Sequence, residues 1–196
     1  QFIAVLILPV AVVIALFSYE VILLWTQNPM TAEKTHMIVS VMICGTALNG
    51  LMNPPYALQL AFGWTKLSVI KNIIAVVILV PLIFFLTMHY GAIGASYAWL
   101  ILNMGYVIFE IPVMHSKILQ KEMWRWYWND VGVPILAGLS LAGLGRLLLS
   151  GTASQSMMVF HLVVISALTL GITAVFLPTI RSILYHQFLR IKLSSS

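Results

Sequence analysis

Five polar or aromatic residues near the middle of the chain fall on one face of a predicted helix. Ser96, Trp99, Asn103, Tyr106 and Glu110 follow one another at intervals of three or four residues, which places them on a single stripe of an α-helix. The residues around them are mostly apolar, so this stripe requires water, a polar ligand or a polar partner helix. Two interpretations stay open: interhelical hydrogen bonds, or the wall of a substrate path. The path candidates on this stripe are Ser96, Asn103, Tyr106 and Glu110.

Small residues occupy the opposite face of the same predicted helix, at Gly91, Gly94, Ala98 and Gly105. Small side chains let the backbones of two helices approach closely inside a membrane. We therefore expect a neighbouring helix to pack tightly against this face, while the polar stripe points away from that contact.

A second group of polar residues surrounds two adjacent prolines in the stretch NGLMNPPYALQLAFGWTK, residues 49–66. Pro54 and Pro55 lack backbone N–H groups, so two carbonyls one turn earlier lose their usual helical partners. We expect a kink there, with the two prolines as a hinge. The freed carbonyls either accept hydrogen bonds from Asn49 or Asn53, or face a water-filled transport path. The path candidates in this stretch are Asn49, Asn53, Tyr56 and Gln59.

Membrane-spanning helices must position these residues. Of the 196 residues, 61% are hydrophobic and only 8% are charged, and the mean hydropathy is +1.03, whereas a soluble domain carries far more charge. Crossing a bilayer takes about 20 predominantly apolar residues. We predict an all-α, polytopic transmembrane helix bundle of about six spans, at residues 2–25, 36–62, 69–88, 91–113, 131–149 and 159–178.

The basic residues are distributed unequally between the two sides of these spans. One side carries Lys34 and Arg146, and the other carries Lys66, Lys71, Lys117, Lys121, Arg125, Arg181, Arg190 and Lys192. Because cytoplasmic loops are enriched in Lys and Arg, this asymmetry predicts that both ends of the chain are cytoplasmic. The net charge of +5 is then a determinant of topology, and we expect no nucleic-acid partner.

Acidic residues within the predicted spans are limited to Glu20 and Glu110. A charge inside a span is costly and is a functional hypothesis by default. Glu20 lies near the outer boundary, so it is either a candidate for ion coupling or a solvated helix end. The single cysteine and the scattered histidines indicate neither a disulfide framework nor a metal site, and we expect no cofactor.

An aromatic and basic segment, KEMWRWYWND at residues 121–130, is predicted to lie in a cytoplasmic loop. Trp and Tyr beside Lys and Arg are typical of the membrane interface. The alternative interpretation is a platform on which sugar rings stack.

Several stretches resemble polysaccharide transporters of the O-antigen flippase type, within the multidrug/oligosaccharidyl-lipid/polysaccharide exporter superfamily. The most specific are PPYALQLAFGWTK and YGAIGA. The resemblance covers nearly all of residues 1–130 and is looser in the last two spans. It implies the last six helices of a fourteen-helix, two-lobed transporter: residues 1–130 supply four spans of the second lobe and the cytoplasmic aromatic loop, and residues 131–196 supply two C-terminal spans and a tail. Since the chain does not begin with Met, we expect a fragment of a longer protein.

The resemblance implies alternating-access transport of an undecaprenyl-pyrophosphate-linked oligosaccharide across the bacterial cytoplasmic membrane, beside glycan polymerase and ligase machinery. Lys66 and Lys71, expected on the cytoplasmic turn after the second span, are candidates for contacting the phosphate. As surface cations, however, lysines at such positions are more often determinants of topology.

Two other functions stay open. One is a small-molecule or drug antiporter of the same superfamily. The other is a membrane enzyme of glycan assembly, although the short outer loops lack the paired carboxylates, or the histidine with a carboxylate, that such chemistry needs. We therefore expect a transporter and no enzyme.

Overall fold

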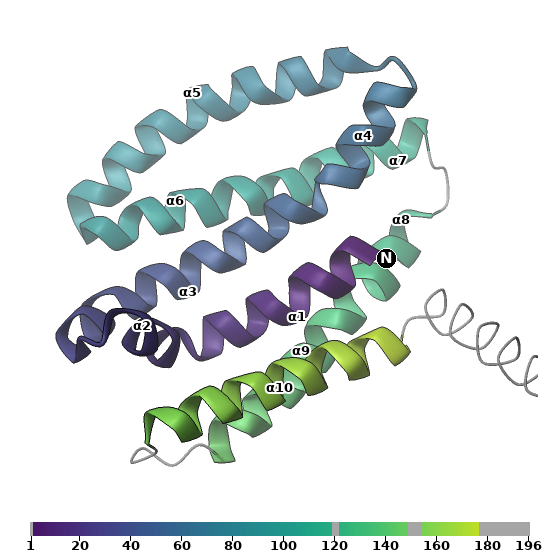
Figure 1. Cartoon of the computed structure of the whole chain (residues 1–196). Coiled ribbons are helices and arrows are strands. Elements are labelled where there is room, and N and C mark those ends of the chain that lie inside the picture. The colour runs from purple at the N-terminus through teal and green to yellow at the C-terminus, as the bar shows by residue number, and fades with distance from the viewer. Residues whose placement is uncertain (1, 119–121, 149–153, 177–196) are drawn as a thin grey trace, which may run out of the picture. The chain divides into compact units, whose positions relative to one another are not determined.

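The computed structural model describes residues 2–118, 122–148 and 154–176, and every regular element in these ranges is helical (Figure 1). In chain order they are α1 (Phe2–Leu16), α2 (Ser18–Thr26), α3 (Pro29–Leu51), α4 (Asn53–Ala61), α5 (Thr65–Tyr90), α6 (Ala92–Gly105), the π-helix η1 (Tyr106–Glu110), α7 (Ile111–Lys117), α8 (Met123–Arg125), the π-helix η2 (Trp126–Gly132), α9 (Val133–Leu148) and α10 (Gln155–Phe176). Within these ranges five helical stretches are long and apolar enough to cross a membrane, or six if the bent pair α1–α2 counts as one span. The predicted all-α polytopic fold is confirmed. The predicted basic tail lies outside the described residues.

Contacts between residues divide the chain into two compact units, Ile14–Trp124 and a second formed by Gln1–Val13 with Arg125–Ser196. In the first unit, α6 packs against both α3 and α5, and α2 packs against α3 (Figure 1). In the second unit, α9 packs against α10. The sequence-based division into 1–130 and 131–196 concerns transporter lobes and stays a prediction.

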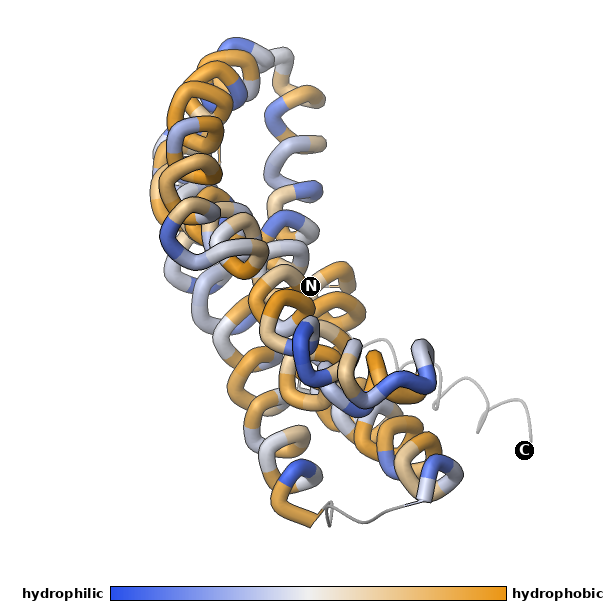
Figure 2. Tube along the Cα trace, turned by 90° about the vertical axis from the view of Figure 1, so that its left-hand side faces the viewer, coloured by the Kyte–Doolittle hydropathy of each residue, from blue (hydrophilic) through white to orange (hydrophobic). Residues whose placement is uncertain are grey.

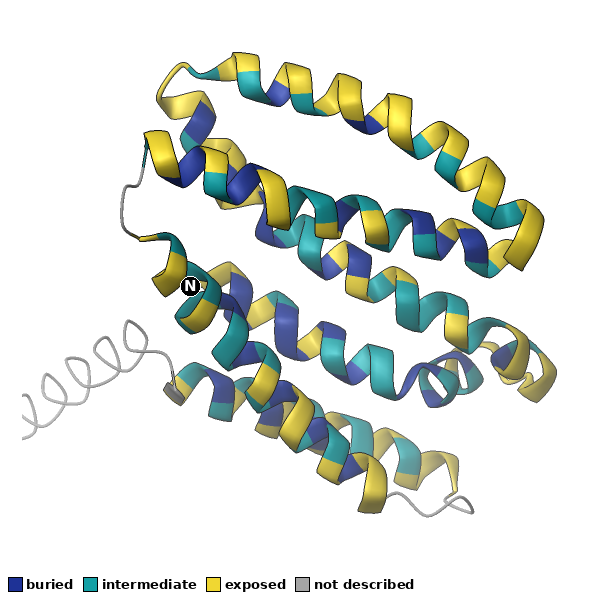
Figure 3. Cartoon of the chain, turned by 180° about the vertical axis from the view of Figure 1, so that it is seen from behind, coloured by how far each residue is buried: buried dark blue, intermediate teal, exposed yellow. Residues whose placement is uncertain are grey.

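Much of the apolar surface of the helices is exposed. Hydrophobic residues dominate the long helices (Figure 2), and α5 is exposed along most of its length (Figure 3). Only 6% of the apolar stretch of α5 is buried. An apolar surface of this extent is stable against lipid or another protein and not against water.

The first predicted span, residues 2–25, is not one straight helix. It bends by 79° between α1 and α2, at the fully buried Phe17. Two serine hydroxyls support the bend: Ser40 Oγ donates to the carbonyl oxygen of Ala15 at 2.6 Å and lies 2.8 Å from Ser18 Oγ. The sequence does not indicate the bend, because these contacts come from α3, about 25 residues away, and hydropathy does not register them.

Helix α3 begins at Pro29, well before the predicted start at residue 36. Asn28 caps it, because Asn28 Oδ1 accepts a hydrogen bond from the Thr31 amide at 3.2 Å, and Pro29 fits the first helical position, where no N–H donor is needed. The predicted loop over residues 27–35 therefore reduces to Gln27 and Asn28.

The predicted interruption near the two prolines is present: α3 ends at Leu51 and α4 begins at Asn53. The Met52 amide donates to the carbonyls of Asn49 and Gly50, and the prolines occupy the first turn of α4, where a missing N–H costs little. The carbonyl of Gly50 is thus satisfied by the backbone and not by a nearby amide side chain. Because α3 and α4 together still form one apolar stretch of 33 residues, this is an interrupted span.

The predicted close contact on the small-residue face is confirmed at Gly94. A side-chain carbon there would collide with the backbone carbonyl of Leu86, so α5 and α6 approach through a position that only glycine fills. Gly91 makes the reversal between them with a positive φ of 66°. At Gly105 an added carbon would meet nothing within 4 Å, so the prediction was wrong there: η1 begins at the next residue and ends the α-helical phase.

The aromatic segment is helical, contrary to the predicted loop. Residues Met123–Leu148 form one stretch of 26 residues long enough to span a membrane, in which Trp124 is 76% and Trp128 is 64% exposed. The loop prediction failed because the charges and amides of this segment masked its continuity with the apolar run that follows. Its assignment to the membrane interface stays a prediction.

Candidate functional site

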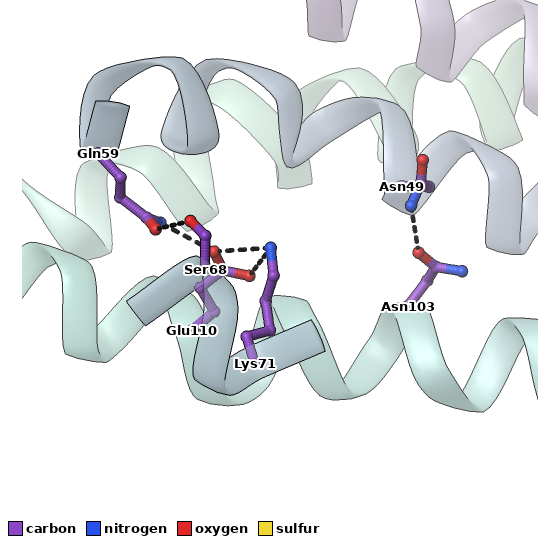
Figure 4. A network of polar contacts seen from close by, with 6 residues as sticks. All are labelled: Asn49, Gln59, Ser68, Lys71, Asn103 and Glu110. Carbon is purple, nitrogen blue, oxygen red and sulfur yellow. Dashed lines mark hydrogen bonds and ion pairs between the residues drawn. The ribbon is translucent and has the colours of Figure 1, made fainter. Parts of the chain in front are cut away.

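A charged cluster joins three helical segments of the first unit around the carboxylate of Glu110 (Figure 4). Lys71 Nζ lies 3.1 Å from Glu110 Oε1 and 3.0 Å from Oε2. Gln59 Nε2 donates to Glu110 Oε1 at 2.8 Å, and Ser68 Oγ donates to Gln59 Oε1 at 3.0 Å. We call these four residues the Glu110 cluster.

The cluster lies almost entirely out of solvent. Gln59 is fully buried, Glu110 and Ser68 are each 5% exposed, and the Lys71 side chain is 16% exposed. A single charge in such a place would be strongly unfavourable, whereas a paired and hydrogen-bonded one is tolerated. Lys71 and Glu110 therefore neutralise each other, and Gln59 orients the carboxylate.

Two aromatic rings complete the surroundings of Lys71. Its ammonium nitrogen lies 4.9 Å from the centre of the Tyr106 ring and 5.7 Å from that of Tyr56. Both distances are in the range where a cation is attracted to the face of an aromatic ring. Lys71 is thus held by one carboxylate and two tyrosines.

Local backbone features bring these residues together. The chain reverses between α4 and α5 through Phe62, Gly63 and Trp64, where Gly63 has a φ of 68°, so Gln59 and Ser68 face each other across the turn. The π-helix η1 carries both Tyr106 and Glu110, and its wider turn sets their direction relative to α6. Such π-helical turns inside α-helices occur often at functional sites.

A groove of about 650 Å³ runs beside the cluster, between α5 and the segment formed by α6, η1 and the start of α7. Its walls are almost wholly apolar, with Ile74, Ile78, Leu102 and Phe109 among them. Lys71, Tyr106 and Glu110 also line it. The groove therefore combines a long apolar wall with one ion pair, an arrangement suited to an amphiphile.

A second polar contact, entirely neutral, joins α3 and α6. Asn49 Nδ2 donates to Asn103 Oδ1 at 2.9 Å (Figure 4). Asn103 Nδ2 donates to the Trp99 carbonyl at 2.8 Å, and Trp99 Nε1 donates to Thr46 Oγ1 at 3.2 Å. Asn103 is fully buried. We call these four residues the amide contact; it is the interhelical hydrogen bonding that the sequence left as one of two interpretations.

The structure gathers some of the sequence-predicted residues and separates others. Tyr56, Gln59, Lys71, Tyr106 and Glu110 come together at the Glu110 cluster, and Asn49 and Asn103 form the amide contact. Ser96 is buried in α6, whereas Asn53, beside the hinge prolines, and Lys66, in the first turn of α5, are exposed. Glu20 is buried in α2, which does not fit a solvated helix end. Its proposed ion coupling, like the path and hinge assignments, stays a prediction.

Lys71 requires a correction. It was expected on a surface turn, but α5 begins at Thr65, so Lys71 lies two turns inside a span. The prediction failed because Lys66 and Lys71 read as a polar loop, although the helix starts directly after Trp64. Ser68 was missed altogether, since a serine in an apolar helix carries no signal until the turn places Gln59 opposite it.

Comparison with known proteins identifies no relative: no family model, no curated protein and no solved structure matches the chain. In the part of the chain that the structure describes, no group of three or more His, Cys, Asp or Glu side chains could hold a metal ion.

Proposed function

We propose that the chain is part of a membrane transporter that moves a lipid-linked oligosaccharide across the bacterial cytoplasmic membrane by alternating access. The observation that carries the proposal is the Glu110 cluster itself: a buried ion pair within apolar spans, on the wall of an apolar groove. Charges at such positions mark substrate and ion pathways. The resemblance of PPYALQLAFGWTK and YGAIGA to the O-antigen flippase type supplies the class of substrate.

The physical task of such a transporter is to keep polar groups of the substrate out of hydrocarbon, where each unsatisfied group costs several kcal/mol. The groove offers an apolar wall for a polyprenyl chain, and Lys71 offers a cation for a phosphate. The interruption of the span at Met52 provides a place where α4, which carries Gln59, can move relative to α3. No bond is made or broken in the substrate.

The alternative of a small-molecule antiporter for cations finds less support at this site. A cationic drug needs an acidic residue to neutralise it, and Glu110 is already paired with Lys71 at 3.0 Å. Lys71 is paired to the same extent, so the preference for a phosphate-bearing lipid rests on the long apolar wall of the groove and on the resemblance.

The sidedness of the lipid-linked glycan in living cells tests the proposal. Cells are depleted of the protein that contains this chain, in a strain without a redundant transporter, and the intermediate is probed on each leaflet with a membrane-impermeant label. We expect it to accumulate on the cytoplasmic leaflet and to return to normal when the wild-type gene is supplied. Normal sidedness during depletion would overturn the proposal and favour small-molecule export.

A topology experiment tests the orientation that the proposal assumes. Reporter fusions after Trp64 and after Lys117 should both report the cytoplasm, because basic residues lie at or beside both positions. A fusion after Gly91 should report the opposite side. Glycan polymerase and ligase machinery remain the proposed partners, to be sought by crosslinking in the same strain.

A further inference from the structure

Lys71 is the only cation that the groove presents among its lining residues, and it is already occupied. Its ammonium contacts both oxygens of Glu110 and lies over two tyrosine rings. An anionic ligand in the groove can therefore bind Lys71 closely only if the Glu110 carboxylate separates from the Lys71 ammonium.

We propose that the groove binds the anionic headgroup of a long-chain lipid at Lys71, in exchange for the Glu110 carboxylate, and that this exchange is accompanied by uptake of one proton at Glu110. The inference rests on the proposed function for the identity of the lipid that is transported. It adds to that function a coupling of substrate binding to protons at a named pair of residues.

The charge balance of the buried site gives the direction of the coupling. With Glu110 ionised, the pair is neutral, and an added phosphate would bring an uncompensated negative charge into a region of low dielectric. With Glu110 protonated, Lys71 and a singly charged headgroup restore neutrality. The proton goes from water to the Glu110 carboxylate, no covalent bond of the ligand changes, and binding of the anion and of the proton assist each other.

The groups around Glu110 allow it to hold a proton without losing its position. Gln59 Nε2 donates to Oε1, and that oxygen still accepts when the carboxyl is neutral. Two titratable groups, Tyr106 from η1 and Tyr56 from α4, face the Lys71 ammonium. His115, one turn beyond on α7, directs Nδ1 to the Ile111 carbonyl at 2.9 Å.

The shape of the groove selects an amphiphile over a small anion. On α5 the apolar lining runs from Ile74 to Leu82, and Ile101 and Leu102 of α6 line the groove as well. Lys71 and Glu110 lie together toward the start of α5 and the end of η1. A headgroup at Lys71 therefore leaves its hydrocarbon chain along the apolar wall.

The test is calorimetric titration of the purified full chain in dodecyl maltoside micelles with farnesyl phosphate. Titrations in buffers of different ionisation enthalpy give the number of protons taken up. We expect wild-type protein to take up close to one proton more than Glu110→Gln, which retains the titration of the probe and lacks that of Glu110. Wild-type affinity should fall more steeply with rising pH than that of Glu110→Gln, by up to about tenfold per pH unit for one linked proton.

Matched variants assign the cation. Lys71→Gln should weaken binding of farnesyl phosphate at least tenfold and leave binding of neutral farnesol unchanged. Lys66→Gln, an exposed lysine on the same helix, should bind as wild type. Equal weakening by both lysine variants would show general attraction of charge and overturn the assignment.

Two outcomes overturn the exchange itself. They are wild-type binding without any proton uptake beyond that of the probe, and equal pH dependence in wild type and Glu110→Gln. If Glu110→Gln does not fold, the same buffer comparison on wild type uses farnesyl sulfate, whose single negative charge does not titrate, so that any proton taken up belongs to the protein. Proton-linked binding with normal glycan sidedness would support the anion site and overturn the proposed flippase function. Altered sidedness without proton uptake would support the flippase function and overturn the exchange at Glu110.

Discussion

The Glu110 cluster and the amide contact both involve the continuous helical segment of α6 and η1, and each has a buried polar residue at its centre. They differ in charge and in what lies beside them. The amide contact is neutral and lies between two helices that pack tightly, α3 and α6. The Glu110 cluster is charged and lines an open groove. Amide pairs between membrane helices hold them together, whereas a buried ion pair adds little to stability and is costly to break. The difference suggests that one contact serves assembly and the other serves a ligand.

Breaking the ion pair from one side should produce the largest effect. Lys71→Met leaves Glu110 buried without its cation, and we expect a loss of about 3–5 kcal/mol at neutral pH. The measurement is thermal unfolding in detergent micelles, compared with Glu110→Gln and with the double variant. The double variant should recover most of the loss, because no unpaired charge remains. If Lys71→Met unfolds like wild type, the pair is not buried as described.

Adding a methyl group where two helices meet at a glycine should have the next largest effect. An added Cβ at Gly45, on α3, would lie 2.7 Å from Trp99 Cδ1 and 3.1 Å from the Cα of Leu100. We expect Gly45→Ala to cost about 1–3 kcal/mol through overpacking, again by thermal unfolding. Its matched control is Gly105→Ala, which meets nothing within 4 Å and lines the groove. Equal losses of stability in both variants would contradict the description of Gly45 as a tight contact and Gly105 as an open position.

The amide contact itself should have a smaller and purely structural effect. Asn103→Leu removes the hydrogen bonds to Asn49 and to the Trp99 carbonyl, at a cost of about 1 kcal/mol. We expect glycan flipping per folded molecule to stay near the wild-type value, measured by sidedness and normalised to membrane abundance. Reduced flipping at unchanged abundance would show that Asn103 lines the path after all.

The smallest effect should come from an exposed cation–aromatic contact. Lys117 Nζ lies 4.6 Å from the centre of the Trp64 ring, and the Lys117 side chain is exposed. Lys117→Gln should lower stability by at most about 1 kcal/mol and leave binding of farnesyl phosphate unchanged. A change in that binding would mean that the cationic site extends beyond Lys71.

The sequence predicts the features that depend on neighbouring residues. Hydropathy locates the spans, and Pro54 and Pro55 locate the interruption at Met52. Features that depend on distant residues were out of reach. The bend at Phe17 needs Ser40, and the pairing of Lys71 with Glu110 joins residues 39 positions apart.

The candidate site was predicted in parts and not as a whole. Tyr56, Gln59, Tyr106 and Glu110 were named from polarity and spacing, and Lys71 from the resemblance. The stripe from Ser96 to Glu110, however, was drawn as one uninterrupted α-helix. In the structure α6 ends at Gly105, and the chain continues directly into the π-helix η1. No residue type marks a π-helical turn, so the direction of Glu110 relative to Asn103 could not follow from spacing.

That π-helical turn has a consequence for how the charged site could arise or vanish in a gene. Its hydrogen bonds enclose one residue more than those of an α-helix, so losing one codon within Tyr106–Glu110 would return the segment to regular α-helix. Because the wider turn is what accommodates the extra residue, the helix after it would keep nearly its direction and its facing. Asn103 would keep its partner, and the change would fall on the side chains carried within the turn, such as Tyr106, which lies over the Lys71 ammonium. A single in-frame deletion would therefore disturb the charged site and spare the amide contact.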